Sequence, residues 1–283
     1  MAQPTLAVRD QRELARQLAR ESKAVRRETF TMAYRSKSGH LGSAFSIVDI
    51  LTVLYGHFLR IDPKNPKNPD RDRFILSKGH GCSSLYVTLA RRGFFDPALL
   101  ETFIQDGSHL PGHPSSMLLP GIEASTGSLG HGLGIGIGMA LAGKRDSKTY
   151  RTVAILSDGE CDEGSTWEGI LTAHHWQLGN LIAIVDYNKI QSFGRVSEVM
   201  ELEPFAAKWQ SFGWDTQEVD GHDHSALLAA LERAAEDRGQ PHVIIAHTTK
   251  GKGVSFMEDT VDWHYWTPNE QHYTQAMREL SAD

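Results

Sequence analysis

The sequence predicts an α/β fold, a single domain built on a mostly parallel sheet with helices on both faces. Its 283 residues suit one large domain with a substantial core, and we expect that domain to span residues 1–283. Short apolar runs rich in β-branched residues recur along the chain, separated by segments of helical length. This alternation is typical of parallel sheets. Because the runs do not alternate with polar residues, we expect strands that are buried on both faces.

Composition and charge argue against several kinds of partner and indicate the environment of the protein. The chain has 29 Lys and Arg residues against 35 Asp and Glu residues, so its formal net charge is −6. This acidic balance argues against nucleic acid or an anionic membrane as the main partner. Cys82 and Cys161 lack the spacing of a metal or redox motif, which favours a reduced protein. No apolar run is long enough to span a bilayer, and the amino terminus has no signal-peptide pattern, so we expect a cytoplasmic protein.

The first part of the chain is predicted to be helical. Over about residues 10–33, apolar residues recur at helical spacing among charged ones: Leu14, Leu18, Val25 and Phe30. Glutamates interrupt the basic face of this helix, which favours a helix packed on the protein surface over a membrane-bound one. A second, mostly apolar helix is expected over 47–58, opened by Ser46. A further helix is expected over 83–92.

His40, His80 and His113 lie in predicted loops of the first 113 residues. His40 lies in a turn between two helices and is flanked by glycine. His80 follows a predicted strand over 73–77, at the end where open α/β sheets bind ligands. His113 lies between a glycine and a proline. A turn explains each histidine alone, but three exposed imidazoles that can exchange protons near neutral pH favour a functional role.

Residues 125–138 combine several glycines with large apolar residues. They do not form a dinucleotide-binding fingerprint, because apolar residues stand where its last glycine is required. Glycine costs a helix about 1 kcal/mol per residue, which only close packing offsets. We therefore expect a buried helix pressed against a neighbouring backbone, with its amino end at Thr126-Gly127-Ser128 pointing NH groups at a ligand. A flexible glycine-rich linker is the alternative.

The middle of the chain predicts a strand, a helix and a second strand. Residues 152–156 and 181–185 are short apolar runs that suit buried strands. Residues 165–178 have helical length, and Ser165 or Thr166 would cap that helix. Such a unit is right-handed and its two strands are parallel, so their carboxyl ends open on the same edge of the sheet.

Asp158 and Asn188 follow these two strands and should therefore face one point in space. A carboxylate and a carboxamide, with no Cys or His between them, suit a hard cation such as Mg²⁺ or Ca²⁺. The remaining ligands would be a backbone carbonyl of the turn that ends at Ile190, water, and oxygens of a bound phosphate compound. Gly159 would let the backbone approach such a ligand. A plain turn and cap explain these residues about equally well.

The last part of the chain predicts helices around one more strand. A helix is expected over 204–212, and a buried strand over 242–246 ends in a loop that suits ligand binding. His222 and His224 resemble half a metal site, but no further ligands follow, so capping of a helix over 225–235 is favoured. A helical tail is expected over about residues 268–280.

Five stretches recur in an order and spacing that resemble one family over roughly residues 10 to 280. They are 38–42 (SGHLG), 71–80 (RDRFILSKGH), 111–114 (PGHP) with 126–130 (TGSLG), 157–164 (SDGECDEG) with 186–190 (DYNKI), and 249–253 (TKGKG) with His264. The fourth resembles the thiamine diphosphate motif, and the set resembles transketolase. The resemblance implies the thiamine diphosphate-binding fold. Transketolase chains usually continue through a pyrimidine-binding and a third domain, so this chain resembles the amino-terminal, diphosphate-binding subunit of a split transketolase.

The resemblance implies ligands for the cofactor and its metal. Asp158, Asn188 and the Ile190 carbonyl would hold Mg²⁺ (or Ca²⁺), and Gly159 with the metal would hold the diphosphate of thiamine diphosphate. The other residues that it places by the cofactor are His80, Gly127, Ser128, Leu129, Glu163 and His264. Ser157, Tyr187 and His131 depart from the residues usual in the family, but none of these departures removes a metal ligand.

The resemblance also implies the reaction. A two-carbon ketol unit would pass from a ketose to an aldose through a carbanion of the cofactor. The catalytic residues would be His40, His80, His113 and His264, which bind sugar hydroxyls and move protons, and Glu163 near the subunit interface. A positioned acid or base accelerates such proton transfers by about 10²–10⁴-fold. A subunit of another thiamine enzyme, such as a 2-oxoacid dehydrogenase or a synthase that joins a 2-oxoacid to an aldehyde, is the alternative.

The implied partner is a separate pyrimidine-binding subunit that carries the glutamate activating the cofactor. We expect an α2β2 heterotetramer with small sugars as substrates and no nucleic acid or membrane partner. Residues that bind the far end of the sugar lie mainly in the other half of the enzyme. A pentose phosphate, an apiose-derived phosphate and a sulfonated sugar therefore all remain compatible with this sequence.

Overall fold

A single parallel sheet forms the centre of the molecule in the computed structural model, which describes residues 8–236 and 238–282. Its five strands are ordered β1-β2-β3-β5-β4, and every neighbouring pair is parallel. The strands are β1 (Arg73–Leu76), β2 (Thr152–Ser157), β3 (Leu181–Tyr187), β4 (Asp215–Asp220) and β5 (His242–His247). The predicted α/β class and parallel sheet are confirmed.

Four of the five strands were predicted, and β4 was not. Strands β2 and β3 are buried at every position, as their unbroken apolar runs indicated. Strand β4 is polar and only partly buried, because it lies at the edge of the sheet and pairs with β5 alone. Its sequence therefore has no apolar run to mark it.

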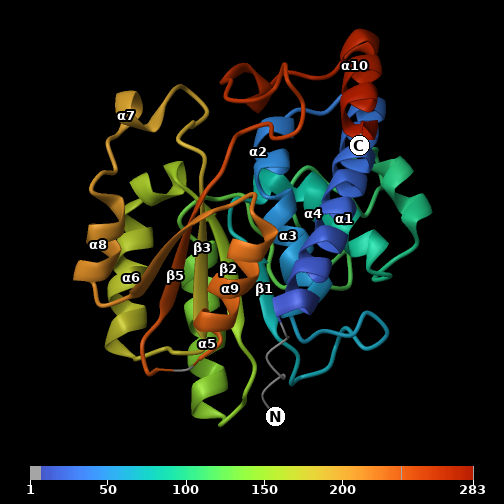
Figure 1. Ribbon diagram of the computed structural model, residues 1–283. Helices are drawn as coiled ribbons and strands as arrows, with labels where there is room; N and C mark the ends of the chain where they lie inside the picture. Colours follow the sequence, from blue (N-terminus) through green and yellow to red (C-terminus); the bar gives the residue numbers. More distant parts are fainter. Residues whose placement is uncertain (1–7, 237, 283) are drawn as a thin grey trace.

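Helices cover both faces of the sheet (Figure 1). Phe74 and Leu76 point to one face, where they pack with α1 (Val8–Ser36), α3 (Val48–Val53), α4 (Cys82–Arg91) and α9 (His224–Ala234). Ile75 points to the other face, which is covered by α5 (Gly132–Arg145), α6 (Gly164–His175) and α8 (Phe205–Ser211). Successive strand residues thus feed two separate cores, as the pleat of a strand requires.

Most of the remaining elements lie near the carboxyl end of the sheet, but the π-helical turn lies at its amino end, where the Phe58 carbonyl accepts from Arg151 Nη2 at 2.7 Å. Helices α2 (Leu41–Ser46) and α10 (Glu270–Ser281) share a small core with α1, centred on Phe30 and Trp263. The short elements are α7 (Val196–Val199), a π-helical turn (Leu54–Phe58) and four 3-10 turns, Gly79–Gly81, Pro97–Thr102, Gly159–Asp162 and Asp262–His264. Within the described residues, no helix combines the length and apolar character needed to cross a membrane.

Two predicted helix starts were wrong. Ser46 does not open a helix: it lies at the end of α2, and its hydroxyl donates to Asp186 Oδ2 at 2.7 Å. Helix α6 begins at Gly164, with Glu163 as its N-cap, and not at Ser165 or Thr166. The Ser165 hydroxyl instead donates to the carbonyl of Gly130 at 3.0 Å. Both serines hold distant segments together, which a local capping rule does not detect.

The glycine-rich helix also differs from its prediction. It begins at Gly132, and the predicted amino end at Thr126-Gly127-Ser128 lies in a loop. Close packing explains some of its glycines, because a Cβ on Gly132 would lie 2.7 Å from Ser77 Cα. By contrast, a Cβ on Gly134 or Gly138 would have no described atom within 4 Å beyond its chain neighbours and the nearby backbone of its own helix. One side of α5 is therefore exposed and not buried.

The amino ends of β1 and β2 are joined by a buried carboxylate. Asp72, whose side chain is 0% exposed, is bound by Arg60 Nη2 at 2.8 Å and by Arg151 Nη2 at 2.6 Å. Burial opposes ionisation, but the hydrogen bonds from Arg60 and Arg151 outweigh it, so the pKa of Asp72 lies below its ordinary value of 3.8. Because its folded-state pKa is lowered, Asp72 stabilises the fold above its unfolded pKa, and this contribution is lost as the pH falls through the folded pKa.

We predict that Asp72→Asn lowers the free energy of unfolding by about 3 kcal/mol at neutral pH, because it leaves two arginines without their buried partner. Asp70→Asn is a matched control: Asp70 is 61% exposed and pairs with Lys148, so its loss should cost under about 1 kcal/mol. Urea denaturation of the three proteins measures both values. Equal effects of the two substitutions would contradict the assignment.

Candidate active site

The carboxyl ends of the parallel strands bring the predicted site residues together. Ser157 in β2 pairs in register with Asp186 in β3, so Asp158 and Asn188 leave the sheet side by side. The amide of Lys189 donates to Asp158 Oδ2 at 2.6 Å, which ties the two loops directly. The predicted convergence of Asp158 and Asn188 is therefore observed, whereas their binding of a metal stays a prediction.

Asp158 is a buried carboxylate with no cationic partner in direct contact among the described residues. It is 1% exposed, and its hydrogen bonds come from the amides of Gly159 at 2.7 Å and Lys189 at 2.6 Å. Burial, followed by repulsion from Asp186, raises the pKa of Asp158 to about 6. A bound cation would relieve both effects, so this carboxylate suits a metal ligand.

The turn after β3 supplies two more candidate oxygen ligands, Asn188 Oδ1 and the Ile190 carbonyl. Asn188 donates its amide to Asp186 Oδ2 at 3.0 Å, and its Oδ1 accepts the amide of Ile190 at 3.0 Å, which leaves one lone pair of Oδ1 for a cation. Lys189, between them, has a φ of 66° in the left-handed region, which turns the chain sharply. No three His, Cys, Asp or Glu side chains gather into a possible metal site anywhere in the described chain. A mixed set of carboxylate, carboxamide and carbonyl suits Mg²⁺ or Ca²⁺ instead.

A buried ion pair lies beneath this turn. Lys78, after β1, donates from Nζ to Asp186 Oδ2 and, at 3.0 Å, to the carbonyl of Ser43. Neither Lys78 nor Asp186 has an exposed side chain. Burial opposes ionisation of Asp186, but the charge of Lys78 outweighs it, so the pKa of Asp186 lies below its ordinary value. The sequence contained no local signal for this pair, whose members are 108 positions apart.

Lys250, in the loop after β5, connects the metal-side turn to one of the histidines. Its Nζ lies 3.0 Å from the carbonyl of Ile190, 3.1 Å from that of Gln191 and 2.9 Å from His264 Nδ1. An ammonium group has three protons, and these three acceptors use all of them. His264 Nδ1 is then an acceptor, so its ring proton is on Nε2. Burial, followed by repulsion from Lys78, lowers the pKa of Lys250 to about 8.

The four histidines predicted from separate motifs form one cluster. The His40 ring centroid lies 5.5 Å from that of His80, 6.3 Å from that of His113 and 5.1 Å from that of His264. His80 and His264 are 5.3 Å apart. His40 has a φ of 62°, an uncommon conformation for a residue with a side chain, and its amide donates to the carbonyl of His264 at 2.9 Å.

The cluster is neutral at physiological pH. Burial lowers the pKa of all four histidines, and the neighbouring lysines add to this effect for His40, His80 and His264. The pKa of His264 falls to about 3. Neutral imidazoles can each donate one proton and accept another. In the described residues, His40 Nδ1 is buried without a hydrogen-bond partner. A buried polar atom without a partner is costly, so it points to a ligand that would satisfy it.

The loop with Gly127, Ser128 and Leu129 lies against the histidines, before the first residue of α5. A Cβ on Gly127 would lie 2.7 Å from the His113 ring, so only glycine fits there, and its φ of 135° also favours glycine. The buried carboxylate of Glu160 fixes the end of this loop, accepting the amide of Gly130 at 2.9 Å and the hydroxyl of Ser77. Glu160 was not predicted to have this role.

Glu163 and Gly159 both lie in the loop that follows β2 at the carboxyl edge of the sheet. Glu163 is exposed, next to the loop, since a Cβ on Gly130 would lie 2.8 Å from Glu163 Cβ. A Cβ on Gly159 would lie 3.0 Å from Gln191 Cγ, so the absence of a side chain there leaves room for the loop after β3. The roles of both residues in cofactor binding and catalysis stay predictions.

The prediction that His222 and His224 cap α9 was wrong. Asp223 is the N-cap, and its side chain accepts the amides of Ser225 at 2.8 Å and Ala226 at 3.2 Å. Both histidines instead turn toward Asp49 of α3, with His222 Nδ1 at 2.7 Å and His224 Nε2 at 3.4 Å from its carboxylate oxygens. The sequence pattern His-x-His could not reveal a carboxylate 173 positions away.

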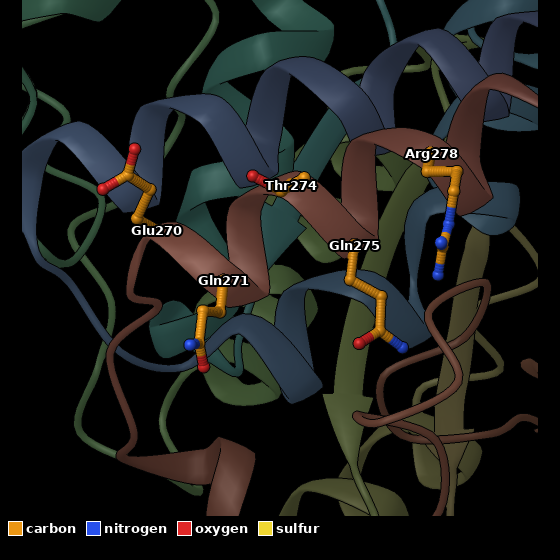
Figure 2. A pocket seen from close by; sticks show the side chains of 5 residues that line it. All are labelled: Glu270, Gln271, Thr274, Gln275 and Arg278. Carbon is orange, nitrogen blue, oxygen red and sulfur yellow. The ribbon is translucent and has the colours of Figure 1, made fainter.

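At least two surface hollows of the described chain lie outside the histidine cluster. One is lined by Glu270, Gln271, Thr274, Gln275 and Arg278, which all project from α10 (Figure 2). Because a single helix supplies all five polar side chains, this hollow is typical of a solvated helix face. The other opens where β3, β5 and β4 end, and its lining includes Asn188, His222, Thr248 and Thr249.

Comparisons with known proteins agree with this geometry. The family model of the transketolase thiamine diphosphate binding domain matches residues 19–281. An apulose-4-phosphate transketolase subunit from Phocaeicola vulgatus is 41% identical, over 92% of this chain and 92% of that protein. A 6-deoxy-6-sulfo-D-fructose transketolase subunit from a Clostridium species is 40% identical, over 94% of this chain and 97% of that protein.

Solved transketolases share the fold. The transketolase of Leishmania mexicana superimposes with a TM-score of 0.88 and 29% identity, and that of Campylobacter jejuni with a TM-score of 0.88 and 31% identity. Each alignment covers 94% of this chain but only 41% and 43%, respectively, of the longer transketolase chain. The resemblance inferred from the five motifs is confirmed, and the chain belongs to the transketolase family as its thiamine diphosphate-binding domain.

Proposed function

We propose that this protein is one subunit of a two-subunit transketolase, which transfers a two-carbon ketol unit from a ketose to an aldose. The observation that supports this most strongly is the cluster of four neutral histidines beside Asp158 and Asn188 at the carboxyl edge of the sheet. A transferred ketol unit carries hydroxyl groups along its length, and neutral imidazoles can both donate to and accept from hydroxyls.

The alternative is a subunit of a thiamine enzyme that acts on 2-oxoacids. Such an enzyme removes carbon dioxide from its substrate and has less need for groups that bind ketose hydroxyls. The histidine cluster therefore favours ketol transfer, as does the name transketolase carried by relatives that align over 92% to 97% of their own length.

A divalent cation, Mg²⁺ or Ca²⁺, would be held by Asp158, by Asn188 Oδ1 and by the Ile190 carbonyl. Asp158 lacks a cation in direct contact in the described chain, and Asn188 Oδ1 retains a free lone pair, so both fit this role. The positive charge of Lys250, which has only neutral hydrogen-bond partners, lies close by and would favour the diphosphate anion. When bound, thiamine diphosphate supplies the carbon that takes up the electron pair of the cleaved bond.

The histidines would handle the protons of the sugar. Cleavage beside the ketose carbonyl requires a base to take the proton from the neighbouring hydroxyl, and the reverse step returns a proton to the acceptor oxygen. His264 presents Nε2–H because Lys250 occupies Nδ1, so it suits a hydrogen-bond donor. His40 Nδ1 is buried and makes no hydrogen bond among the described residues, so His40 suits a second contact with the sugar.

For the substrate we propose a ketose with an anionic group at its far end. Two relatives are named for apulose 4-phosphate and one for 6-deoxy-6-sulfo-D-fructose, which carry a phosphate and a sulfonate. The described residues of the cluster provide neutral imidazoles for the reacting end of such a sugar. The group that binds its anionic end would belong to the partner.

We propose that the partner is a pyrimidine-binding subunit that covers Glu163 and the exposed side of α5, in an α2β2 assembly in the cytoplasm. The apulose-4-phosphate transketolase relatives are each named as one subunit of their enzyme, which implies a second subunit for those proteins. On α5, Gly134 and Gly138 face open space, beside Ile135, which is 37% exposed. Leu171 and Trp176 on the adjoining α6 segment are 57% and 43% exposed. An apolar face with glycines suits close contact with another chain.

The proposed function is tested by two substitutions in the assembled enzyme. Asp158→Ala should weaken Mg²⁺-dependent binding of thiamine diphosphate by more than about 100-fold, since even outer-shell partners of a metal contribute about 10–100-fold. Asp162→Ala, which removes an exposed carboxylate of the same motif, is the control. Calorimetry that finds equal cofactor affinity in both variants would exclude Asp158 as a metal ligand.

His264→Ala should instead lower the rate of ketol transfer by about 10²–10⁴-fold and leave cofactor affinity within a few-fold, because it acts on protons of the sugar. His109→Ala, in an exposed loop outside the cluster, should leave both quantities unchanged. A coupled assay with ketose phosphates and a sulfonated ketose as donors measures the rate. Full turnover by His264→Ala would show that His264 takes no part in ketol transfer.

The exposed side of α5 predicts that one substitution will raise the stability of the isolated chain and weaken its binding to the partner. Gly138→Ala should stabilise the isolated chain by up to about 1 kcal/mol, because alanine favours the helix and its Cβ meets no described atom. The same substitution should weaken binding of the partner. Gly143→Ala is the contrast, since its Cβ would lie 2.7 Å from the Tyr150 ring and should destabilise the chain itself.

Urea denaturation and sedimentation of the chain with its partner measure both effects. Unchanged partner affinity in the Gly138→Ala protein would show that the subunit interface lies elsewhere.

A further inference from the structure

His222 forms a bridge between a helix of the core and the loop after β5. Its Nδ1 lies 2.7 Å from Asp49 Oδ2 on α3, and its Nε2 accepts the backbone amide of Thr249 at 2.8 Å. The side chain is 13% exposed. His222 is distant in sequence from both partners: 173 positions from Asp49 and 27 from Thr249.

The two hydrogen bonds define the protonation of the ring. A backbone amide can only donate, so His222 Nε2 must be an unprotonated acceptor. The proton is therefore on Nδ1, where it is donated to the carboxylate of Asp49. Both ring nitrogens are thus occupied, and His222 has no free nitrogen for a metal. The orientation of this imidazole is fixed from both sides.

The carboxylate of Asp49, which holds one end of this bridge, is itself fixed by other residues. Arg26 of α1 donates to both of its carboxylate oxygens, at 3.0 Å and 2.6 Å, and Arg26 and Asp49 are 7% and 4% exposed. Burial opposes ionisation, but the charge of Arg26 and the hydrogen bond from His222 outweigh it, so the pKa of Asp49 lies well below its ordinary value. His224 Nε2 lies 3.4 Å from the same carboxylate and 2.9 Å from the Ser22 hydroxyl.

The segment that His222 holds carries contacts of the candidate site. Thr248 donates its hydroxyl to Asp186 Oδ1, and Lys250 donates to the Ile190 carbonyl and to His264. Thr249 lies between these two residues and points its amide the other way, toward His222. Fixing this amide therefore fixes the positions from which its two neighbours reach the metal-side turn and the histidine cluster.

We propose that His222 is a positioning residue for the active site: as the Nδ1–H tautomer held by Asp49, it anchors the Thr249 amide and so places Lys250 against the Ile190 carbonyl and His264. This inference rests on the proposed function, because it assigns the purpose of the bridge to cofactor binding and ketol transfer. His222 itself touches neither the histidine cluster nor the proposed metal ligands through any hydrogen bond given by the described residues.

Two substitutions separate the two ends of the bridge. In His222→Gln the amide oxygen can occupy the place of Nε2 and still accept from Thr249. In His222→Asn the shorter amide can occupy the place of Nδ1 and donate to Asp49, but it leaves the Thr249 amide without an acceptor. His224→Asn is the matched control, because His224 contacts the same carboxylate but makes no hydrogen bond with the Thr249 loop.

Three measurements on the full-length chain and on its assembled enzyme test the proposal. Nitrogen-15 NMR of the imidazoles should find the Nδ1–H tautomer at His222. Hydrogen exchange of the segment around Thr249 should be slow in the wild type, in His222→Gln and in His224→Asn, and at least tenfold faster in His222→Asn. Affinity for thiamine diphosphate with Mg²⁺ should fall about 10-fold or more in His222→Asn, as for outer-shell partners of other metal sites, and stay within about threefold in the other variants.

A protonated Nε2, or His222→Asn with wild-type exchange and wild-type cofactor affinity, would overturn the proposal. If His222→Asn lowers the melting temperature but leaves cofactor affinity and turnover unchanged, His222 has a structural role only, and this result would overturn the proposal as well. Failure of the wild-type enzyme to bind the cofactor would contradict the proposed function instead. The tautomer and the exchange rates, which need no cofactor, would then still decide whether His222 anchors the loop.

Discussion

The ion pair between Lys78 and Asp186 is the interaction on which the site depends. Two charges without exposed surface are stable only when they are paired and their remaining hydrogen-bonding atoms are satisfied. Asp186 also accepts from Ser46, Asn188 and Thr248, so one carboxylate joins α2, the turn after β3 and the loop after β5. Lys78 adds the end of β1 and the carbonyl of Ser43. The loops that surround the candidate site therefore share one buried anchor.

The ion pair also affects the ionisation of side chains at the carboxyl edge of the sheet. Lys78 and Lys250 disfavour protonated imidazoles nearby, and together with burial they keep His80 and His264 neutral. Asp158 follows the neighbouring strand β2 and has no such cation in contact within the described chain, and its ionisation is opposed by burial and by Asp186. A divalent cation is the ligand that would resolve this imbalance, and an anionic diphosphate would in turn balance the charge of Lys250, whose hydrogen-bond partners are all neutral.

Much of this arrangement could be predicted from the sequence because parallel strands place all their carboxyl ends on one edge. That rule brought Asp158 and Asn188 together, and motif order grouped His40, His80, His113 and His264. The rule could not find β4, whose polar edge residues have no apolar period, or the exposed side of α5, since glycines in a helix look alike whether they contact a neighbour or face open space. Asp49, Lys78 and Lys250 were also missed as network members, because their partners are far apart in sequence and only the fold makes them neighbours.

The site as described suits one end of thiamine diphosphate, and the proposed function assigns the other end to a partner subunit. The most direct test is the rate of ketol transfer from a ketose phosphate to an aldose phosphate, measured with Mg²⁺ and thiamine diphosphate. We expect no turnover by the isolated chain at any cofactor concentration, and turnover once an equimolar pyrimidine-binding subunit is added. Sustained turnover by the isolated chain would contradict the division of the site between two chains.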